Sequence, residues 1–391
     1  MKEKDITAVD RIDKSIKALE DKSFNIFFFV VDSKNVPNSS MEYVYEMALT
    51  LKNAGFNVTM LYQLGGAYTQ AELHRKKKLG KNIDYTKVFT GVGEWLGEEY
   101  AKIQHMNVSS DEWVVSPSDI LFIPEAFSSL MFETYKHKAP CKRVVLLQNF
   151  QNVTDFIPVG VEWKNYGILD VVASTKKQEE LINSVFPYVH TKVLNPMINP
   201  MYRKSVKPKK LLVNIIAPNQ RVVNMIVKNF YWKYPMYKFI SFVDLRGLPR
   251  EEFSEKLKEG FVTVWVDSET TFGYSALEAI KSGNILIGKV PDTIPEWMVN
   301  SDGSLSDCGI WTYDTTMMPD LISKVVGSWM QNEIPEELNK SMDGVSSLYS
   351  IEEWNKNVLN VVNEIIDEQK KTFTSIKASI LEGENNKEEE K

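Results

Sequence analysis

The sequence predicts an α/β protein made of two doubly wound, Rossmann-like domains. Its 391 residues exceed what one hydrophobic core usually serves, so two domains of about 150 to 200 residues are expected. Continuous apolar runs such as FNIFFFVV and VTVWV are typical of parallel strands that are covered on both faces. These runs alternate with helical patterns along the chain, and this alternation indicates a series of βαβ units.

The first series begins with a helix and an apolar strand at 25–31. A helix at 40–54 ends at Gly55 and leads into a strand at 57–62. Further strands are predicted at 88–90, 120–123, 144–148, 171–174 and 192–194, with helices at 128–137 and 176–185. Together they predict an N-terminal domain over residues 1–197.

A second series follows a linker that is rich in proline and helix-breaking residues, at 195–200. We expect strands at 211–217, 237–243, 262–267, 285–290 and 308–314, and helices at 222–231, at 251–259 and after Gly273. The pattern predicts a C-terminal domain at 198–350, a helical segment at 351–381 and a disordered acidic tail at 382–391.

Composition limits the classes of function. The formal net charge of −6 argues against a broadly basic surface for gripping nucleic acid. The N-terminus lacks the apolar core of a signal peptide, and no apolar run is long enough to span a bilayer, so we expect a cytoplasmic protein. Cysteine and histidine show no metal-binding spacing. We expect the four histidines to lie at the surface: His74, His105, His137 and His190.

The stretch 267–298 predicts an anion site, because a strand runs into a short polar loop that opens onto a helix. Gly273 lets the backbone approach a ligand, and the amides of Tyr274, Ser275 and Ala276 lack intrahelical partners. They can donate to phosphate oxygens at the positive end of the helix dipole. Glu278, one turn later, could accept hydrogen bonds from a ribose. The alternatives are an ordinary turn glycine and a solvated helix carboxylate.

The segment TTFGYSALEAIKSGNILIG, followed by PEW, resembles the signature region of retaining glycosyltransferases of the GT-B fold, especially family 4. The matching residues are Phe272, Gly273, Glu278, Ala279, Gly283, Pro295 and Glu296. The family carries two Glu eight residues apart; the first contacts the donor sugar and the second holds the ribose. Here Thr270 stands at the first position, and Glu269 lies one place early. The resemblance implies a donor site formed by Thr270, Thr271, Phe272, Gly273, Tyr274, Ser275 and Glu278.

The resemblance also implies a cation for the donor diphosphate. Arg221 stands nine residues before Phe230, where the family carries a Lys, and an Arg could bind phosphate bidentately. A companion Arg expected about five residues earlier is absent. A surface salt bridge is the alternative role for Arg221. In the first domain, Asn38 and Ser39 occupy the place of the family's Gly-Gly loop; they could contact the donor or simply cap the next helix, expected to begin at 41 or 42.

Candidate catalytic residues are Arg221, Glu125 and Asn149. Many family members carry a His after the middle strands of the first domain, but Glu125 and Asn149 lie at those strand ends here. Glu125 could orient or deprotonate an acceptor, and Asn149 could bond a sugar hydroxyl. Retaining transfer in this fold is thought to need no enzyme nucleophile, so positioning and electrostatic stabilisation suffice. The resemblance implies no metal at the donor site.

The resemblance implies two domains facing across a cleft, with a C-terminal helix crossing back to the first. The leading hypothesis is a hexosyl- or pentosyltransferase that takes a sugar from a nucleoside-diphosphate sugar, most simply a UDP-sugar. The sugar would be transferred to an unknown acceptor, which could be a glycan, a protein, a lipid or a DNA base. One alternative is a virus-type transferase that glycosylates hydroxymethylated DNA bases in the host cytoplasm. The other is a catalytically degenerate GT-B module for binding or assembly, which the Thr270 position would permit.

Overall fold

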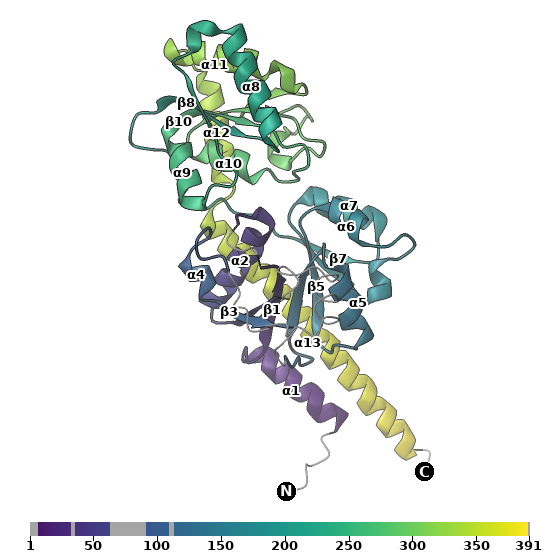
Figure 1. Ribbon diagram of the computed structural model, residues 1–391. Coiled ribbons are helices and arrows are strands. Elements are labelled where there is room, and N and C mark those ends of the chain that lie inside the picture. Colours follow the sequence, from purple (N-terminus) through teal and green to yellow (C-terminus); the bar gives the residue numbers. More distant parts are fainter. Residues whose placement is uncertain (1–6, 33–35, 63–90, 109–112, 390–391) are drawn as a thin grey trace, which may run out of the picture. The chain divides into compact units, whose positions relative to one another are not determined.

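The computed structural model describes residues 7–32, 36–62, 91–108 and 113–389, with side chains to residue 382. It contains two compact units (Figure 1). The N-terminal unit comprises the described residues up to Ala173, together with Glu179–Leu194 and the chain from Asn355 onward. The C-terminal unit comprises Ser174–Gln178 and Asn195–Trp354. Both units are α/β, as the alternation of apolar runs and helical patterns predicts.

The N-terminal unit is built on seven parallel strands in the order β3-β2-β1-β4-β5-β6-β7. The strand order reverses between β1 and β4, where Ile26 pairs with both Val58 and Ile120. Phe28 and Phe122 stack at 4.8 Å between ring centroids across this centre. The strands are β1 (Asn25–Val30), β2 (Asn57–Tyr62), β3 (Gln104–Asn107), β4 (Ile120–Pro124), β5 (Lys142–Leu147), β6 (Asp170–Ala173) and β7 (His190–Val193).

Helices cover both faces of this sheet. From β1 the chain moves to β2 towards one side of the sheet, whereas from β4 it moves through β5 and β6 to β7 towards the other side. Because such crossovers are right-handed, α2 covers one face of the sheet and α5, α6 and α7 cover the other. The described helices before β7 are α1 (Ala8–Glu20), α2 (Ser39–Asn53), α4 (Glu98–Ala101), α5 (Ser128–Lys136), α6 (Phe150–Phe156), η2 (Trp163–Tyr166) and α7 (Lys176–Val185).

The C-terminal unit has five parallel strands in the order β12-β11-β10-β8-β9. They are β8 (Lys210–Ile216), β9 (Ser241–Asp244), β10 (Gly260–Trp265), β11 (Ile285–Lys289) and β12 (Ile310–Thr312). The helices are α8 (Gln220–Lys233), η3 (Pro235–Tyr237), α9 (Arg250–Glu259), α10 (Tyr274–Lys281), η4 (Glu296–Met298), η5 (Thr315–Met317), α11 (Met318–Met330) and α12 (Glu336–Ser347). Strand β10 is buried along its whole length, as its apolar sequence predicts.

The last helix, α13 (Ile351–Glu389), belongs to the N-terminal unit from Asn355 onward. Its Gln369 side chain donates to the Pro117 carbonyl at 2.6 Å, and Glu368 pairs with Lys192 of β7 at 2.7 Å. The C-terminal helix therefore packs on the N-terminal unit, as the resemblance implies. The helix continues past residue 381 into the segment for which the sequence predicts disorder. Adding residues to a helix that is already packed avoids the unfavourable nucleation step.

Some predicted elements differ from the structure. The predicted strand at 237–243 is replaced by the 3₁₀ helix η3 and the shorter β9, because Pro235 fixes a helical φ and starts a turn. Strand β3 was not predicted, since its sequence QHMN shows neither an apolar run nor an alternation. The predicted strand at 88–90 lies outside the described residues. Within those residues, no helix combines the length and the apolarity that a membrane span requires.

Candidate functional site

The turn between β10 and α10 lies at the carboxyl edge of the C-terminal sheet. Gly273 is the N-cap of α10, with φ 77° and ψ 47° in the left-handed region. A Cβ at this position would lie 3.2 Å from a ring carbon of Trp297 and 3.3 Å from one of Trp265. The turn therefore requires glycine both for its backbone angles and for its close contact with two indole rings.

Hydrogen bonds fix the loop that leads into this turn. The Thr270 hydroxyl oxygen accepts from the Gly273 amide at 2.9 Å, and Asp267 Oδ1 accepts from the Glu269 amide at 3.1 Å. On the other side, Trp297 Nε1 donates to the Phe272 carbonyl at 2.6 Å. Burial raises the pKa of Asp267, which was not among the predicted site residues. An acid directly after a buried strand is the sequence signal that could have identified it.

The first turn of α10 differs in one respect from the expected phosphate site. The Ala276 amide donates to the Gly273 carbonyl at 3.1 Å, so it is not available to a ligand. This short-range bond tightens the helix start in the manner of a 3₁₀ turn. The Ser275 amide has no acceptor among the described residues. The amides that can face an anion are therefore those at the very start of the helix.

Glu278 is buried on α10, with 7% of its surface exposed. The alternative interpretation as a solvated helix carboxylate is therefore wrong. Glu278 lies three residues after Ser275, on neighbouring turns of the same helix. A carboxylate in this position is held by its surroundings rather than moving freely in water, and this favours a specific hydrogen-bonding role.

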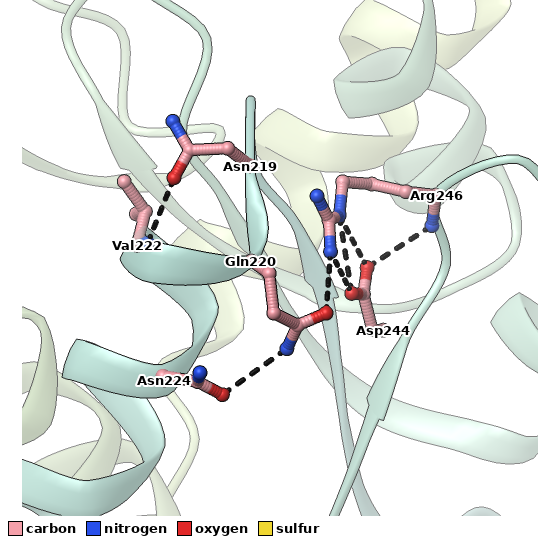
Figure 2. A network of polar contacts seen from close by, with 6 residues as sticks. All are labelled: Asn219, Gln220, Val222, Asn224, Asp244 and Arg246. Atoms are coloured by element: carbon pink, nitrogen blue, oxygen red, sulfur yellow. Dashed lines mark hydrogen bonds and ion pairs between the residues drawn. The ribbon is translucent and has the colours of Figure 1, made fainter.

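Two arginines lie at the same edge of the sheet. Arg221 is exposed in the first turn of α8, where Asn219 caps the helix by accepting from the Val222 amide at 3.1 Å. Arg246 follows β9; its Nε donates to Asp244 Oδ1 at 3.0 Å and its Nη2 donates to Gln220 Oε1 at 2.7 Å (Figure 2).

Arg246 was not predicted, because it lies on a different strand from the expected companion of Arg221. The Asp-Leu-Arg sequence at the end of a strand is the signal for it. The Arg246 guanidinium holds the pKa of Asp244 below its usual value, so the pair stays ionised. The network also fixes the Gln220 side chain at the start of α8, whose amide group donates to Asn224 Oδ1 at 3.1 Å.

In the N-terminal unit, two predicted site residues act as helix caps. Asn38 Oδ1 accepts from the Met41 amide at 3.1 Å and begins α2, whose first residue is Ser39 rather than residue 41 or 42. Asn149 Oδ1 accepts from the Gln151 amide at 3.0 Å at the start of α6. Both side chains satisfy amides that the helix itself leaves without partners.

Glu125 lies at the carboxyl end of β4 and is 2% exposed. It accepts from the Asn149 amide at 3.0 Å, the Asn152 side chain at 2.8 Å and the Gln148 amide at 3.2 Å. Burial raises the pKa of Glu125 despite these donors. The Gln148 side chain in turn donates to the Ser40 carbonyl at 3.1 Å. The structure thus brings Glu125 and Asn149 together in one polar cluster that joins the ends of β4 and β5 to α2.

His105 is not the surface residue that the sequence predicts. It is partly buried on β3, where Nδ1 donates to the Ile103 carbonyl at 2.7 Å and Nε2 accepts from the Tyr45 hydroxyl at 2.8 Å. Burial lowers the pKa of His105 to about 4, so the ring is neutral at pH 7. His74 lies outside the described residues. Over the described parts of the chain, no three His, Cys, Asp or Glu side chains gather as a metal site would require.

Solved glycosyltransferase structures are similar to this protein over most of its length. Sucrose-phosphate synthase from Thermosynechococcus elongatus aligns with a TM-score of 0.56 and 13% identity, over 88% of this chain and 100% of that one. The chain has the GT-B fold. The pneumococcal O-GlcNAc transferase GtfA, in complex with UDP and GlcNAc, aligns with a TM-score of 0.55 and 11% identity, over 88% and 99%.

A third similar structure, Anabaena Alr3699/HepE in complex with UDP, has a TM-score of 0.54 and 10% identity, over 87% of this chain and 100% of that one. No protein-family model matches the sequence, and no curated protein matches it. The fold class expected from the sequence is therefore confirmed by structural similarity.

Proposed function

We propose that the protein is a glycosyltransferase that moves a sugar from a nucleoside-diphosphate sugar, a UDP-sugar, to an acceptor with retention of the anomeric configuration, in the manner of family 4. The observation that carries this proposal is the turn at Gly273, which opens onto α10 with the buried carboxylate of Glu278 one turn further. Similar folds bound to UDP support the choice of nucleotide.

The donor diphosphate would bind at the start of α10. The Ser275 amide and the positive end of the helix dipole face this position. Arg221, exposed after the neighbouring strand β8, would supply positive charge, so that the donor site would need no metal ion. Arg246 is already paired with Asp244 and would instead hold Gln220 at the start of α8. Glu278 would accept hydrogen bonds from the ribose hydroxyls. Thr270 and Thr271, before Phe272, would line the sugar side of the loop.

The reaction would proceed without an enzyme nucleophile. The bond between the anomeric carbon and the diphosphate oxygen breaks, and the acceptor oxygen bonds to that carbon on the same face. The acceptor proton passes to the departing diphosphate. The helix amides and Arg221 stabilise the negative charge that develops on the leaving group. The barrier is lowered by positioning and electrostatics rather than by a covalent intermediate.

The acceptor would bind on the N-terminal unit. Glu125 is enclosed by three donors, which suits it to position the Gln148 and Asn149 backbone rather than to touch the acceptor. The exposed start of α2, at Asn38 and Ser39, offers polar groups at the same edge of the sheet. These residues would therefore shape the acceptor side without taking part in bond breaking.

A turnover assay tests the proposal with wild type and Glu278→Gln. UDP release is measured from a panel of UDP-sugars, with and without glycan, lipid and DNA acceptors. The variant replaces the carboxylate that would accept hydrogen bonds from the ribose with a neutral amide, and this should lower kcat/KM by about tenfold. Glu333→Gln, at an exposed site after α11, is the matched control and should keep wild-type turnover. Inactivity of the wild type with every donor and acceptor would instead favour the degenerate binding module.

A further inference from the structure

A basic and aromatic surface lies at the end of α8 and the turn that follows it. Trp232, Met236 and Phe239 are 73%, 64% and 51% exposed. Together with the exposed Lys228 and Lys238 they form a surface that we call the basic-aromatic patch. Large apolar side chains that gather at the surface of a monomer mark interaction sites. None of these residues belongs to the proposed donor site.

The segment that carries the patch is basic. Residues 221–243 contain Arg221, Lys228, Lys233 and Lys238 and no acidic residue, in a chain of net charge −6. Lys233 pairs with Asp320 of α11 at 3.1 Å. Lys228 and Lys238 have no ion-pair partner among the described residues, so their charges remain available.

The patch is held by a buried aromatic layer. Phe230 is fully buried and contacts Tyr237 and Phe242, with ring centroids 6.1 and 5.1 Å apart. The Tyr231 hydroxyl donates to the Ile240 carbonyl at 2.6 Å. Neighbouring aromatic rings therefore fill the core, while Trp232 and Phe239 keep most or half of their surface exposed. The exposure is a property of an ordered helix and turn, not of an unpacked segment.

The patch lies at the edge of the sheet opposite to the donor site. Helix α8 begins with Gln220 at the carboxyl end of β8 and leads to the start of β9, so its last turn reaches the amino edge (Figure 1). Gly273 lies at the carboxyl edge, after β10. A partner on the patch therefore leaves the donor site uncovered.

We propose that the basic-aromatic patch docks the C-terminal unit on an anionic lipid surface. Trp and Phe side chains settle at the boundary between headgroups and acyl chains, and lysines beside them attract lipid phosphates. Each lysine near an anionic membrane adds about fivefold in affinity. The absence of acidic residues from residues 221–243 matches a negatively charged partner, and the apolar Met236 favours lipid over stacked nucleic-acid bases.

Vesicle sedimentation of the full chain tests this proposal. Binding is measured on vesicles of phosphatidylcholine alone and on vesicles with phosphatidylglycerol added. We expect binding to the anionic vesicles, weakened about tenfold or more in the double variant Trp232→Ser, Phe239→Ser. Tyr313→Ser is the matched control, because this aromatic is 72% exposed after β12 at the carboxyl edge, and it should bind as wild type. Lys228→Gln with Lys238→Gln should weaken binding by about fivefold per charge.

Three outcomes would overturn the proposal. The first is no binding of wild type to anionic vesicles, and the second is equal binding of wild type and the Trp232, Phe239 double variant. The third is self-association or DNA binding that depends on these two residues while vesicle binding does not, because the patch would then serve a protein or nucleic-acid partner. UDP titration of the double variant should match wild type, so this test stays separate from that of the donor site.

Discussion

Thr270 shapes the loop before α10 through its hydroxyl group. The oxygen accepts from the Gly273 amide, and this bond fixes the turn that presents the start of the helix. In the glycosyltransferases that this segment resembles, a Glu at this position contacts the donor sugar. A short hydroxyl side chain that is engaged with the backbone cannot replace that longer carboxylate. If the proposed transferase is correct, sugar selection would therefore depend on other residues of the loop, whereas Glu278 would supply the carboxylate on the ribose side.

His105 should make stability depend on pH in a defined window. Its pKa is about 4 in the folded protein, below the usual 6.5, so the unfolded chain takes up a proton first. The contribution of the neutral His105 ring to the free energy of unfolding is fully present above pH 6.5 and is lost as the pH falls towards 4. It amounts to roughly 3 kcal/mol. Urea unfolding of wild type and His105→Asn over this range should show that the variant lacks this component.

His137→Asn is the matched control for the pH experiment. His137 is exposed on the C-terminal side of α5 and pairs with Glu133 at 3.3 Å. Replacing an exposed histidine should leave the pH profile of wild type unchanged. An identical profile for wild type and His105→Asn would show that the His105 ring is not held neutral by burial.

The sequence identifies some site residues because they follow local rules. Gly273 and Glu278 stand at a strand-to-helix turn and one turn beyond it, a spacing that is visible without a structure. Arg246 was not predicted, and the contacts of the predicted Glu125 could not be, because both depend on neighbours supplied by other strands. Gln220 lies 26 residues from Arg246, and Asn149 lies 24 from Glu125. Such contacts depend on strand order, which no local pattern specifies.

Strand β11 and the indole rings behind it support the loop that precedes α10. The Trp297 ring contacts those of both Trp265 and Trp311, with centroid distances of 6.4 Å and 6.0 Å. Gly288 of β11 leaves room for Trp311, since a Cβ there would lie 2.5 Å from the indole. Close packing of this kind makes the loop geometry sensitive to single methyl groups behind it.

Gly288→Ala and Gly344→Ala should change stability in opposite directions. The added methyl at 288 overpacks the Trp311 ring and should lower the free energy of unfolding by about 1–3 kcal/mol. Gly344 lies inside α12 with no atom within 4 Å of the added Cβ, so alanine there should raise it by up to about 1 kcal/mol. Denaturant unfolding of both variants checks the pair. Equal effects would mean that Trp311 moves aside at little cost.

Helices and long apolar strands could be predicted because their periods are local. The apolar run of β4 (Ile120–Pro124), predicted at 120–123, is an example. Strand β9 was predicted too long because β-favouring aromatics at 237–239 lie in a turn that Pro235 starts. Strand β3 is defined by its pairing with β2 rather than by its own sequence. Tertiary contacts, rather than the local sequence, determine where these short strands form and end.

At the scale of the whole molecule, α13 returns the end of the chain to the N-terminal unit. Val358, Val361, Val362, Ile365 and Ile366 are all buried on this helix. Their burial stabilises that unit by on the order of 10 kcal/mol, which is comparable to the entire stability of a domain. The N-terminal unit therefore depends on residues that follow the C-terminal unit in sequence.

A chain that ends before Asn355 should lose cooperative unfolding of the N-terminal unit. The chain that ends after Leu381 is the control, because residues 381 and 382 are exposed, and it should unfold as the full chain does. Calorimetric unfolding distinguishes the two truncations. Two transitions at wild-type temperatures in the shorter chain would show that α13 is dispensable.

Titration calorimetry with UDP is the most direct test of the proposed nucleoside-diphosphate site at the start of α10. We predict saturable binding of one UDP per chain, tighter than about 1 mM, and weaker binding by Glu278→Gln than by Glu333→Gln. Absence of binding by the wild type at millimolar UDP, GDP and other nucleoside diphosphates would contradict the donor site, and with it the proposed transferase.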